Sequence, residues 1–189
     1  MSDLLRFTDV ACWRGGRLLF KDLSFSLGSG EGLWLRGPNG VGKSSALRLA
    51  AGLLRPLGGA VEAAPAALAD EALALDRELP LRRALTFWSP RDSASRLDAA
   101  LDALDLLRLA EVPVRLLSTG QARRARVARV AASDARLWLL DEPLSGLDSG
   151  SLALVTALLD RHRTSGGAVL LTSHQPLAGP SWRTLDIAA

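Results

Sequence analysis

The clearest chemical signal in the sequence lies at residues 37–44, which read GPNGVGKS. This spacing matches the phosphate-binding loop G-x-x-x-x-G-K-[ST], in which backbone amides surround phosphate oxygens. We predict that Lys43 neutralises the terminal phosphates of a nucleotide and that the Ser44 hydroxyl ligates Mg²⁺. An ordinary Gly/Pro turn ahead of a helix is the alternative interpretation. The residues predicted to hold the cofactor here are Gly37, Pro38, Asn39, Gly40, Val41, Gly42, Lys43, Ser44 and Ser45.

Two carboxylates follow a short apolar run, because residues 137–140 (LWLL) lead directly into Asp141 and Glu142. A buried strand would place both at its carboxyl end, the edge at which open α/β sheets bind ligands. We predict that Asp141 joins the Mg²⁺ shell and that Glu142 polarises the water that attacks a γ-phosphate. A helix cap or an exposed acidic turn is the alternative, since Pro143 and Gly146 follow.

The apolar pattern around these residues predicts an alternation of strands and helices. Strands are expected over residues 18–27, 32–35, 136–140 and 168–172. Helices are expected over residues 44–54, 118–132 and 151–162, and along the apolar face formed by Leu97, Leu101, Leu104 and Leu107. Gly58, Gly59 and the Ala/Pro stretch to Ala67 are expected to break the pattern. The alternation implies one α/β domain with a mostly parallel sheet.

Composition narrows the range of partners and cellular locations. The 189 residues carry 23 basic and 20 acidic side chains, and this net charge of +3 is too small to indicate nucleic acid or an anionic membrane as a partner. The arginines at 123, 124, 126 and 129 are expected to form a solvated helix face. Cys12 is the single cysteine, so a reducing, cytosolic location is expected. The N-terminus does not read as a signal peptide, and no apolar run approaches the roughly 18 residues that span a bilayer.

Three further motifs lie in order along the chain. Residues 117–121 read LSTGQ and are followed by ARRARVARV, residues 145–148 read SGLD, and His174 follows the apolar run AVLLTS. Together with the loop and the two acids, these motifs resemble those of the ATP-binding cassette (ABC) ATPases, whose signature reads L-S-G-G-Q. The resemblance implies a P-loop NTPase fold, ATP and Mg²⁺ as cofactors, and a head-to-tail homodimer. It also implies a core of about residues 1–75 and 119–189 with a helical subdomain at about 76–118.

The same resemblance assigns roles to residues outside the loop. Asp148 falls in the D-loop, His174 is expected to hydrogen-bond the γ-phosphate, and Trp13 is expected to stack on adenine. For Trp13 the alternative is an ordinary buried or surface side chain, and for Ser118 it is a plain helix N-cap. His162 near a helix end is expected to be a solvated polar residue. The residues expected to close over ATP held by the other subunit are Ser118, Thr119, Gly120 and Gln121.

The sequence departs from the family pattern at two places. Thr119 replaces a glycine of the signature, so dimer closure is expected to be less tight there. The glutamine that the family carries after the next core strand is not evident in AALADEALALDREL, and Asp70 or Glu71 lies nearest by spacing. A degenerate module that senses ATP without hydrolysing it is therefore one alternative function.

Within the ABC ATPases, the strings VPVRLLSTGQARRARVARV, RLWLLDEPLSGLD and LLTSHQPL are most similar to the ATPase subunits of the bacterial haem exporter in cytochrome c maturation. This resemblance implies a peripheral protein on the cytoplasmic face of the bacterial inner membrane, which reaches the membrane only through a polytopic partner subunit. The ATPase subunit of another small-substrate transporter is a second alternative. A soluble ABC protein of DNA repair or translation is disfavoured, because such proteins typically carry a long coiled-coil insertion or a second cassette.

Overall fold

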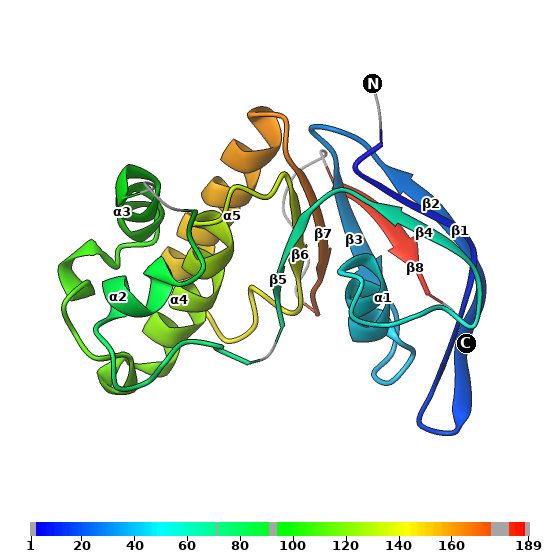
Figure 1. Ribbon diagram of the computed structural model, residues 1–189, viewed down its shortest axis with the longest axis horizontal. Helices are drawn as coiled ribbons and strands as arrows, with labels where there is room; N and C mark the ends of the chain where they lie inside the picture. The colour runs from blue at the N-terminus through cyan, green and yellow to red at the C-terminus, as the bar shows by residue number, and fades with distance from the viewer. Residues whose placement is uncertain (1–2, 71, 91–93, 175–181, 188–189) are drawn as a thin grey trace.

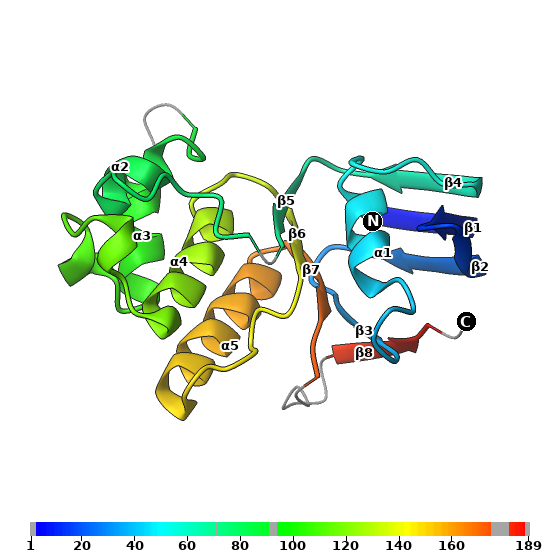
Figure 2. The same ribbon diagram turned by 90° about the horizontal axis from the view of Figure 1, so that it is seen from below.

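Two β-sheets lie on opposite sides of one helix, α1 (Lys43–Ala50), in the computed structural model of this chain (Figures 1 and 2). The structure describes residues 3–70, 72–90, 94–174 and 182–187. The first sheet is parallel, and its strands in spatial order are β5 (Ala66–Ala69), β6 (Leu137–Leu140), β7 (Ala168–Thr172), β3 (Gly32–Arg36) and β8 (Trp182–Asp186). The second sheet is antiparallel, in the order β2 (Arg17–Leu27), β1 (Leu5–Arg14) and β4 (Gly58–Ala63).

The central strands of the parallel sheet are buried on both faces because alternate side chains enter two different cores. In β6, Leu137 and Leu139 pack with α1 and the antiparallel sheet, whereas Trp138 and Leu140 pack against α4 (Thr119–Ala131) and α5 (Ser149–Thr164). This is the two-residue alternation of a strand, and full burial of each leucine contributes about 1.5–3 kcal/mol. The apolar runs predicted at 32–35, 136–140 and 168–172 therefore form central parallel strands, whereas the one at 18–27 forms β2 of the antiparallel sheet.

The segment between β5 and α4 is helical. It contains α2 (Leu81–Thr86), α3 (Ala94–Ala103), and the 3-10 turns η1 (Leu107–Leu109) and η2 (Val114–Leu116). Leu97, Leu101 and Leu104 are buried as predicted, but Leu107 is 40% exposed in η1, so its assignment to the same helix face was wrong. The helix ends at Ala103, and Asp105 takes a left-handed backbone conformation (φ 51°) that redirects the chain. The subdomain boundaries at 76 and 118 stay a prediction.

The stretch that was expected to break the pattern instead forms strands β4 and β5, and the antiparallel sheet was not predicted. Strand β4 pairs with β1, with Leu5 opposite Ala63. At Gly59 (φ 77°) a Cβ atom would collide with the carbonyl oxygens of Thr8 and Asp9, so this glycine permits close strand contact. The α1 helix also ends earlier than expected, at Ala50. Within the described ranges, no helix combines the length and apolar character needed to cross a bilayer.

Candidate nucleotide-binding and hydrolytic site

The predicted phosphate loop connects the end of β3 to the first residue of α1. Gly37 (φ 145°) and Gly42 (φ 115°) take backbone conformations that side chains disfavour. A Cβ on Gly42 would lie 2.8 Å from the Phe20 ring, and one on Gly37 would lie 2.7 Å from the carbonyl oxygen of Ile187. Lys43 is buried, and its Nζ donates to the carbonyl oxygens of Gly37 at 2.8 Å and Pro38 at 3.1 Å. The loop thus curls around its own lysine ammonium at the start of a helix, the arrangement that binds anions.

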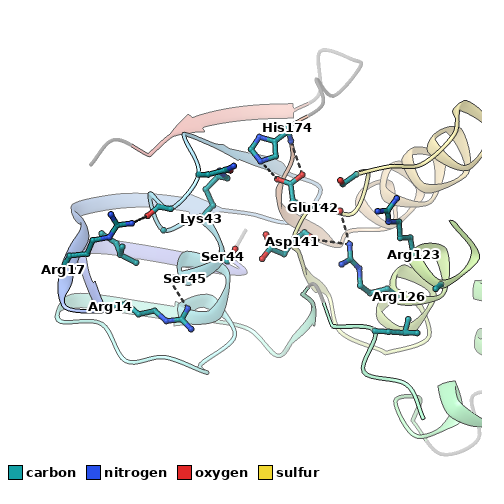
Figure 3. A pocket seen from close by; sticks show the side chains of 18 of the residues that line it. Arg14, Arg17, Lys43, Ser44, Ser45, Arg123, Arg126, Asp141, Glu142 and His174 are labelled. Carbon is teal, nitrogen blue, oxygen red and sulfur yellow. Dashed lines mark hydrogen bonds and ion pairs between the residues drawn. The ribbon is translucent and has the colours of Figure 1, made fainter. Parts of the chain in front are cut away.

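The loop opens onto a cleft with a cavity volume of about 930 Å³ (Figure 3). Most of the residues predicted for the site line this one cleft, although they come from separate parts of the chain. Val41 is buried and packs in the core that contains α1, so it supports the loop from behind. The predicted residues that line the cleft are Asn39, Gly40, Gly42, Lys43, Ser44, Ser45, Thr119, Asp141, Glu142 and His174.

Asp141 lies at the carboxyl end of β6, as the sequence predicted. Its side chain is buried, and Oδ1 accepts a hydrogen bond from the hydroxyl of Thr172 at 2.7 Å. A carboxylate and the Ser44 hydroxyl, both lining the cleft, are the hard oxygen donors that Mg²⁺ takes. The described part of the chain has no group of three or more His, Cys, Asp and Glu residues that could hold a metal alone. The donor set therefore fits a cation shared with phosphate oxygens and water.

Glu142 has a left-handed backbone (φ 48°), which costs a non-glycine residue about 1–2 kcal/mol. Its peptide is held on both sides, because its N–H donates to Thr172 Oγ1 at 3.0 Å and its carbonyl accepts from Arg126 at 3.0 Å. The Glu142 Oε2 atom accepts from the backbone N–H of His174 at 3.2 Å. Oε1 is buried, with no hydrogen-bond partner among the described residues, and lies 3.6 Å from His174 Nε2. A buried carboxylate oxygen with spare accepting capacity suits a general base for water.

Asp70 and Glu71 were the residues nearest to the family's glutamine. Asp70 follows β5, which pairs in parallel with β6, so it lies at the same sheet edge as Asp141. Its Oδ2 is 3.6 Å from a guanidinium nitrogen of Arg48. Glu71 lies outside the described residues. Asp70 can therefore supply an oxygen near this edge, but its identification with the glutamine stays a prediction.

The signature segment forms the beginning of α4. Ser118 is the N-cap, and its Oγ accepts from the N–H of Gln121 at 3.3 Å while Gln121 Oε1 accepts from the N–H of Ser118 at 2.8 Å. This reciprocal capping box is the helix-cap alternative foreseen for Ser118. Thr119 is exposed, and a Cβ on Gly120 would meet no atom within 4 Å, so the start of the helix faces open space. Contact with a second subunit's ATP stays a prediction.

Asp148 occupies at the start of α5 the N-cap position that Ser118 occupies at the start of α4. It is the N-cap of α5, and its Oδ1 accepts from the N–H of Ser151 at 2.7 Å. This hydrogen bond lowers the pKa of Asp148, so its carboxylate is charged at neutral pH. The predicted D-loop residue therefore has a helix-capping role in the structure.

Trp13 lies near the end of β1 with 56% of its surface exposed. It does not line the cleft, although its neighbour Arg14 does. An exposed indole beside the cleft is free of core packing, and its stacking on adenine stays a prediction.

Two expectations about polar side chains were wrong. His162 is not simply solvated: its ring stacks on Trp138 with centroids 3.7 Å apart, and burial lowers its pKa. The arginines of α4 do not form a solvated face either, because Arg124, Arg126 and Arg129 are each less than 10% exposed. Each donates to backbone carbonyls, and burial lowers the pKa of Arg129. Such bonds offset the cost of burying a guanidinium.

Sequence reasoning missed several residues of the cleft. Arg17 donates to the carbonyl of Gly40 at 2.8 Å, and Arg14 lies 3.5 Å from Ser45 Oγ (Figure 3). Both flank the hairpin turn in RGGR, but a basic turn carries no positional information about a loop more than 20 residues away. Thr172 does not line the cleft but bonds to Asp141 and Glu142, and its sequence did carry a signal, because it is a polar residue that ends a buried apolar strand.

Comparisons with known proteins agree with this geometry. The ABC transporter family model matches residues 20–145. The cytochrome c biogenesis ATP-binding export protein CcmA of Sphingopyxis alaskensis is 55% identical over 183 residues, which are 95% of this chain and 94% of the relative. The protein of the same name from Novosphingobium aromaticivorans is 54% identical over 95% of this chain and 93% of its own.

Among solved structures, the ATP-binding subunit of an ABC transporter superposes with a TM-score of 0.81 at 24% identity, over 90% of this chain and 79% of that one. This structural likeness shows the fold, whereas the sequence relatives show to which group within the family the chain belongs. The chain belongs to the ABC transporter family and, within it, to the CcmA group of cytochrome c biogenesis ATP-binding export proteins.

Proposed function

We propose that this chain is the ATP-hydrolysing subunit of an ABC export complex that serves cytochrome c biogenesis, with haem as the cargo that the family resemblance implies. One observation carries the proposal: the phosphate loop faces Asp141, Glu142 and His174 across a single cleft. The chain also matches 94% and 93% of the length of two relatives named as cytochrome c biogenesis ATP-binding export proteins, which supports the same function.

The loop residues bind the polyphosphate of ATP. Lys43 exchanges the carbonyl oxygens of Gly37 and Pro38 for phosphate oxygens, and the amides at the start of α1 surround the same charge. Ser44 and Asp141 would hold Mg²⁺, which supplies neutralisation of the phosphate charge when bound. Trp13 stacks on the base from the end of β1.

Glu142 is the general base of the reaction. Its buried Oε1 accepts the proton of the attacking water, and the carboxylate is oriented by the N–H of His174. The His174 side chain is more than half exposed, so it can hydrogen-bond the terminal phosphate while remaining near the carboxylate.

A second copy of the chain completes the site. The open N-terminus of α4, with Ser118, Thr119, Gly120 and Gln121, presents amides suited to the γ-phosphate held by the partner copy. ATP then favours the closed dimer and hydrolysis releases it, which moves a polytopic membrane subunit. The chain would thus act as a peripheral protein on the cytoplasmic face of the inner membrane.

Steady-state ATPase measurements on the full chain, with Glu142→Gln as the matched variant, test this function. We expect the variant to bind ATP like wild type and to lose about 100-fold or more in kcat, because the general base is removed while the phosphate-binding loop is unchanged. Co-purification of a polytopic membrane protein from the native host tests the partner. Wild-type turnover equal to that of Glu142→Gln would favour the ATP-sensing alternative, which Thr119 in the signature motivates.

A further inference from the structure

Helix α4 carries four arginines, and two of them reach the turns that follow β6. Arg126 donates to the carbonyl oxygens of Asp141 at 3.2 Å and Glu142 at 3.0 Å, and Arg123 donates to that of Gly146 at 2.7 Å. Both line the cleft (Figure 3). Residues three apart share one face of a helix, so the α4 face that carries Arg123 and Arg126 binds two successive turns of the segment 141–146.

The other two arginines make the same kind of bond elsewhere. Arg124 donates to the carbonyl of Leu104 at 2.6 Å, and Arg129 donates to that of Leu68 at 2.7 Å. Neither lines the cleft. The helix thus contains buried arginines that stabilise the fold and, at Arg126, one whose carbonyl partners belong to the catalytic turn.

Glu142 needs such support because its backbone conformation is disfavoured (φ 48°). Thr172 restrains its N–H and Arg126 restrains its carbonyl and the preceding one. Loss of the Arg126 bonds would free the peptide to leave the left-handed region, and the carboxylate would then move away from His174. A shift of about 1 Å in a reacting group can lower a rate about 100-fold.

We infer that Arg126 is a positioning residue for hydrolysis: it holds the Asp141–Glu142 turn so that the Glu142 carboxylate faces the cleft. The inference rests on the proposed function of Glu142. Because Arg126 extends from the helix that begins at Ser118, the same rigid element joins the predicted signature contact to the catalytic carboxylate of its own chain.

The test compares Arg126→Gln with Arg129→Gln in the full chain. Both remove a buried guanidinium from α4 and leave carbonyls without their donor, so both are expected to lower Tm. Only Arg126→Gln should lower kcat, by about 10- to 100-fold, with KM for ATP and the Kd for a fluorescent ATP analogue within about threefold of wild type. Arg129→Gln should keep kcat within about twofold.

A double variant asks whether the effect passes through Glu142. In the Glu142→Gln background, Arg126→Gln should cause no further loss of residual turnover, since the group it positions is already gone. If Arg126→Gln does not fold, Arg126→Lys keeps the charge and one donor, and its kcat should fall about three- to tenfold at unchanged KM.

Equal kcat losses in the Arg126 and Arg129 variants would overturn the inference, as would a multiplicative loss in the double variant or a rise in KM and Kd as large as the fall in kcat. Wild-type kcat in a folded Arg126→Lys variant would also overturn it. These outcomes leave wild-type hydrolysis intact. A wild-type chain without turnover would instead overturn the proposed function, and the inference with it.

Discussion

The hydroxyl of Thr172 lies 2.7 Å from Asp141 Oδ1 and donates to it, although the two residues are 31 positions apart. The Thr172 hydroxyl oxygen also accepts a hydrogen bond from the N–H of Glu142 at 3.0 Å. Thr172 ends β7 and Asp141 follows β6, and these strands are parallel neighbours. One fully buried hydroxyl therefore orients the predicted Mg²⁺ ligand Asp141 and the backbone of Glu142, the proposed general base.

Thr172→Val is expected to keep the shape of the side chain and remove both hydrogen bonds. A buried polar group left unsatisfied costs about 1–3 kcal/mol, so urea unfolding should show a loss of about 2 kcal/mol or more. ATP turnover should fall with it, because the two carboxylates lose their common anchor. Thr172→Ser, which retains the hydroxyl, should keep turnover near wild type; equal activity in the Val variant would show that the anchor is dispensable.

Gly42→Ala is expected to disrupt the phosphate loop. The new methyl group would lie 2.8 Å from the buried ring of Phe20 at a left-handed φ of 115°. Gly52 is the matched control, since its φ is 70° and a Cβ there meets no atom within 4 Å. Both variants carry the backbone cost of about 1–2 kcal/mol. Only Gly42→Ala should weaken ATP binding, by about tenfold or more in an equilibrium titration, which corresponds to about 1.4 kcal/mol. Equal affinities in the two variants would contradict this.

Ser118 variants separate its helix-cap role from the predicted contact with a partner's ATP. Ser118→Ala should cost about 1 kcal/mol of stability, whereas Ser118→Asn should preserve the cap, because asparagine caps as well as serine. If the hydroxyl also contacts the γ-phosphate, both variants lose turnover and ATP-dependent dimerisation, measured by light scattering. Wild-type turnover in Ser118→Asn would show that Ser118 acts only as a helix N-cap.

His162 is expected to make stability pH-dependent. Burial lowers its pKa in the folded chain, so below the ordinary histidine pKa the unfolded chain binds more protons. The neutral ring of His162 therefore contributes its full share to the free energy of unfolding above the ordinary histidine pKa, and this contribution is lost as the pH falls through the lowered pKa of the folded chain. Denaturant unfolding at pH 7.5 and 5.5 should show a larger loss in wild type than in His162→Phe, which keeps the stack on Trp138. An equal loss in both would assign the pH dependence to other groups.

Much of the site was predictable because its motifs are local. The glycines of the loop, the two acids after an apolar run and the serine that begins a helix each depend on neighbours within a few residues. Their placement at strand and helix ends in the structure follows those predictions. The parallel sheet was predictable for the same reason, since alternating strands and helices restrict its topology.

The wrong predictions concern residues whose structure depends on hydrogen bonds to segments far away in the sequence. Composition marked residues 58–67 as a break, but β4 gains its hydrogen bonds from β1, about 50 residues earlier. Helical spacing placed the arginines of α4 in solvent, but carbonyl groups of β5 and of the turn after β6 lie within their reach.

By itself, the sequence determined that this protein carries a lysine-containing loop of the phosphate-binding type, has an acidic pair at a strand end, and belongs among the ABC ATPases, because these properties reside in short contiguous segments. Only the tertiary structure decided that Thr172 anchors both acids, that Glu142 adopts a left-handed backbone, and that Arg126 binds its carbonyl. The physical reason is that a backbone carbonyl or a buried hydroxyl acquires its partner from packing, and packing joins segments whose separation along the chain leaves no trace in local residue patterns.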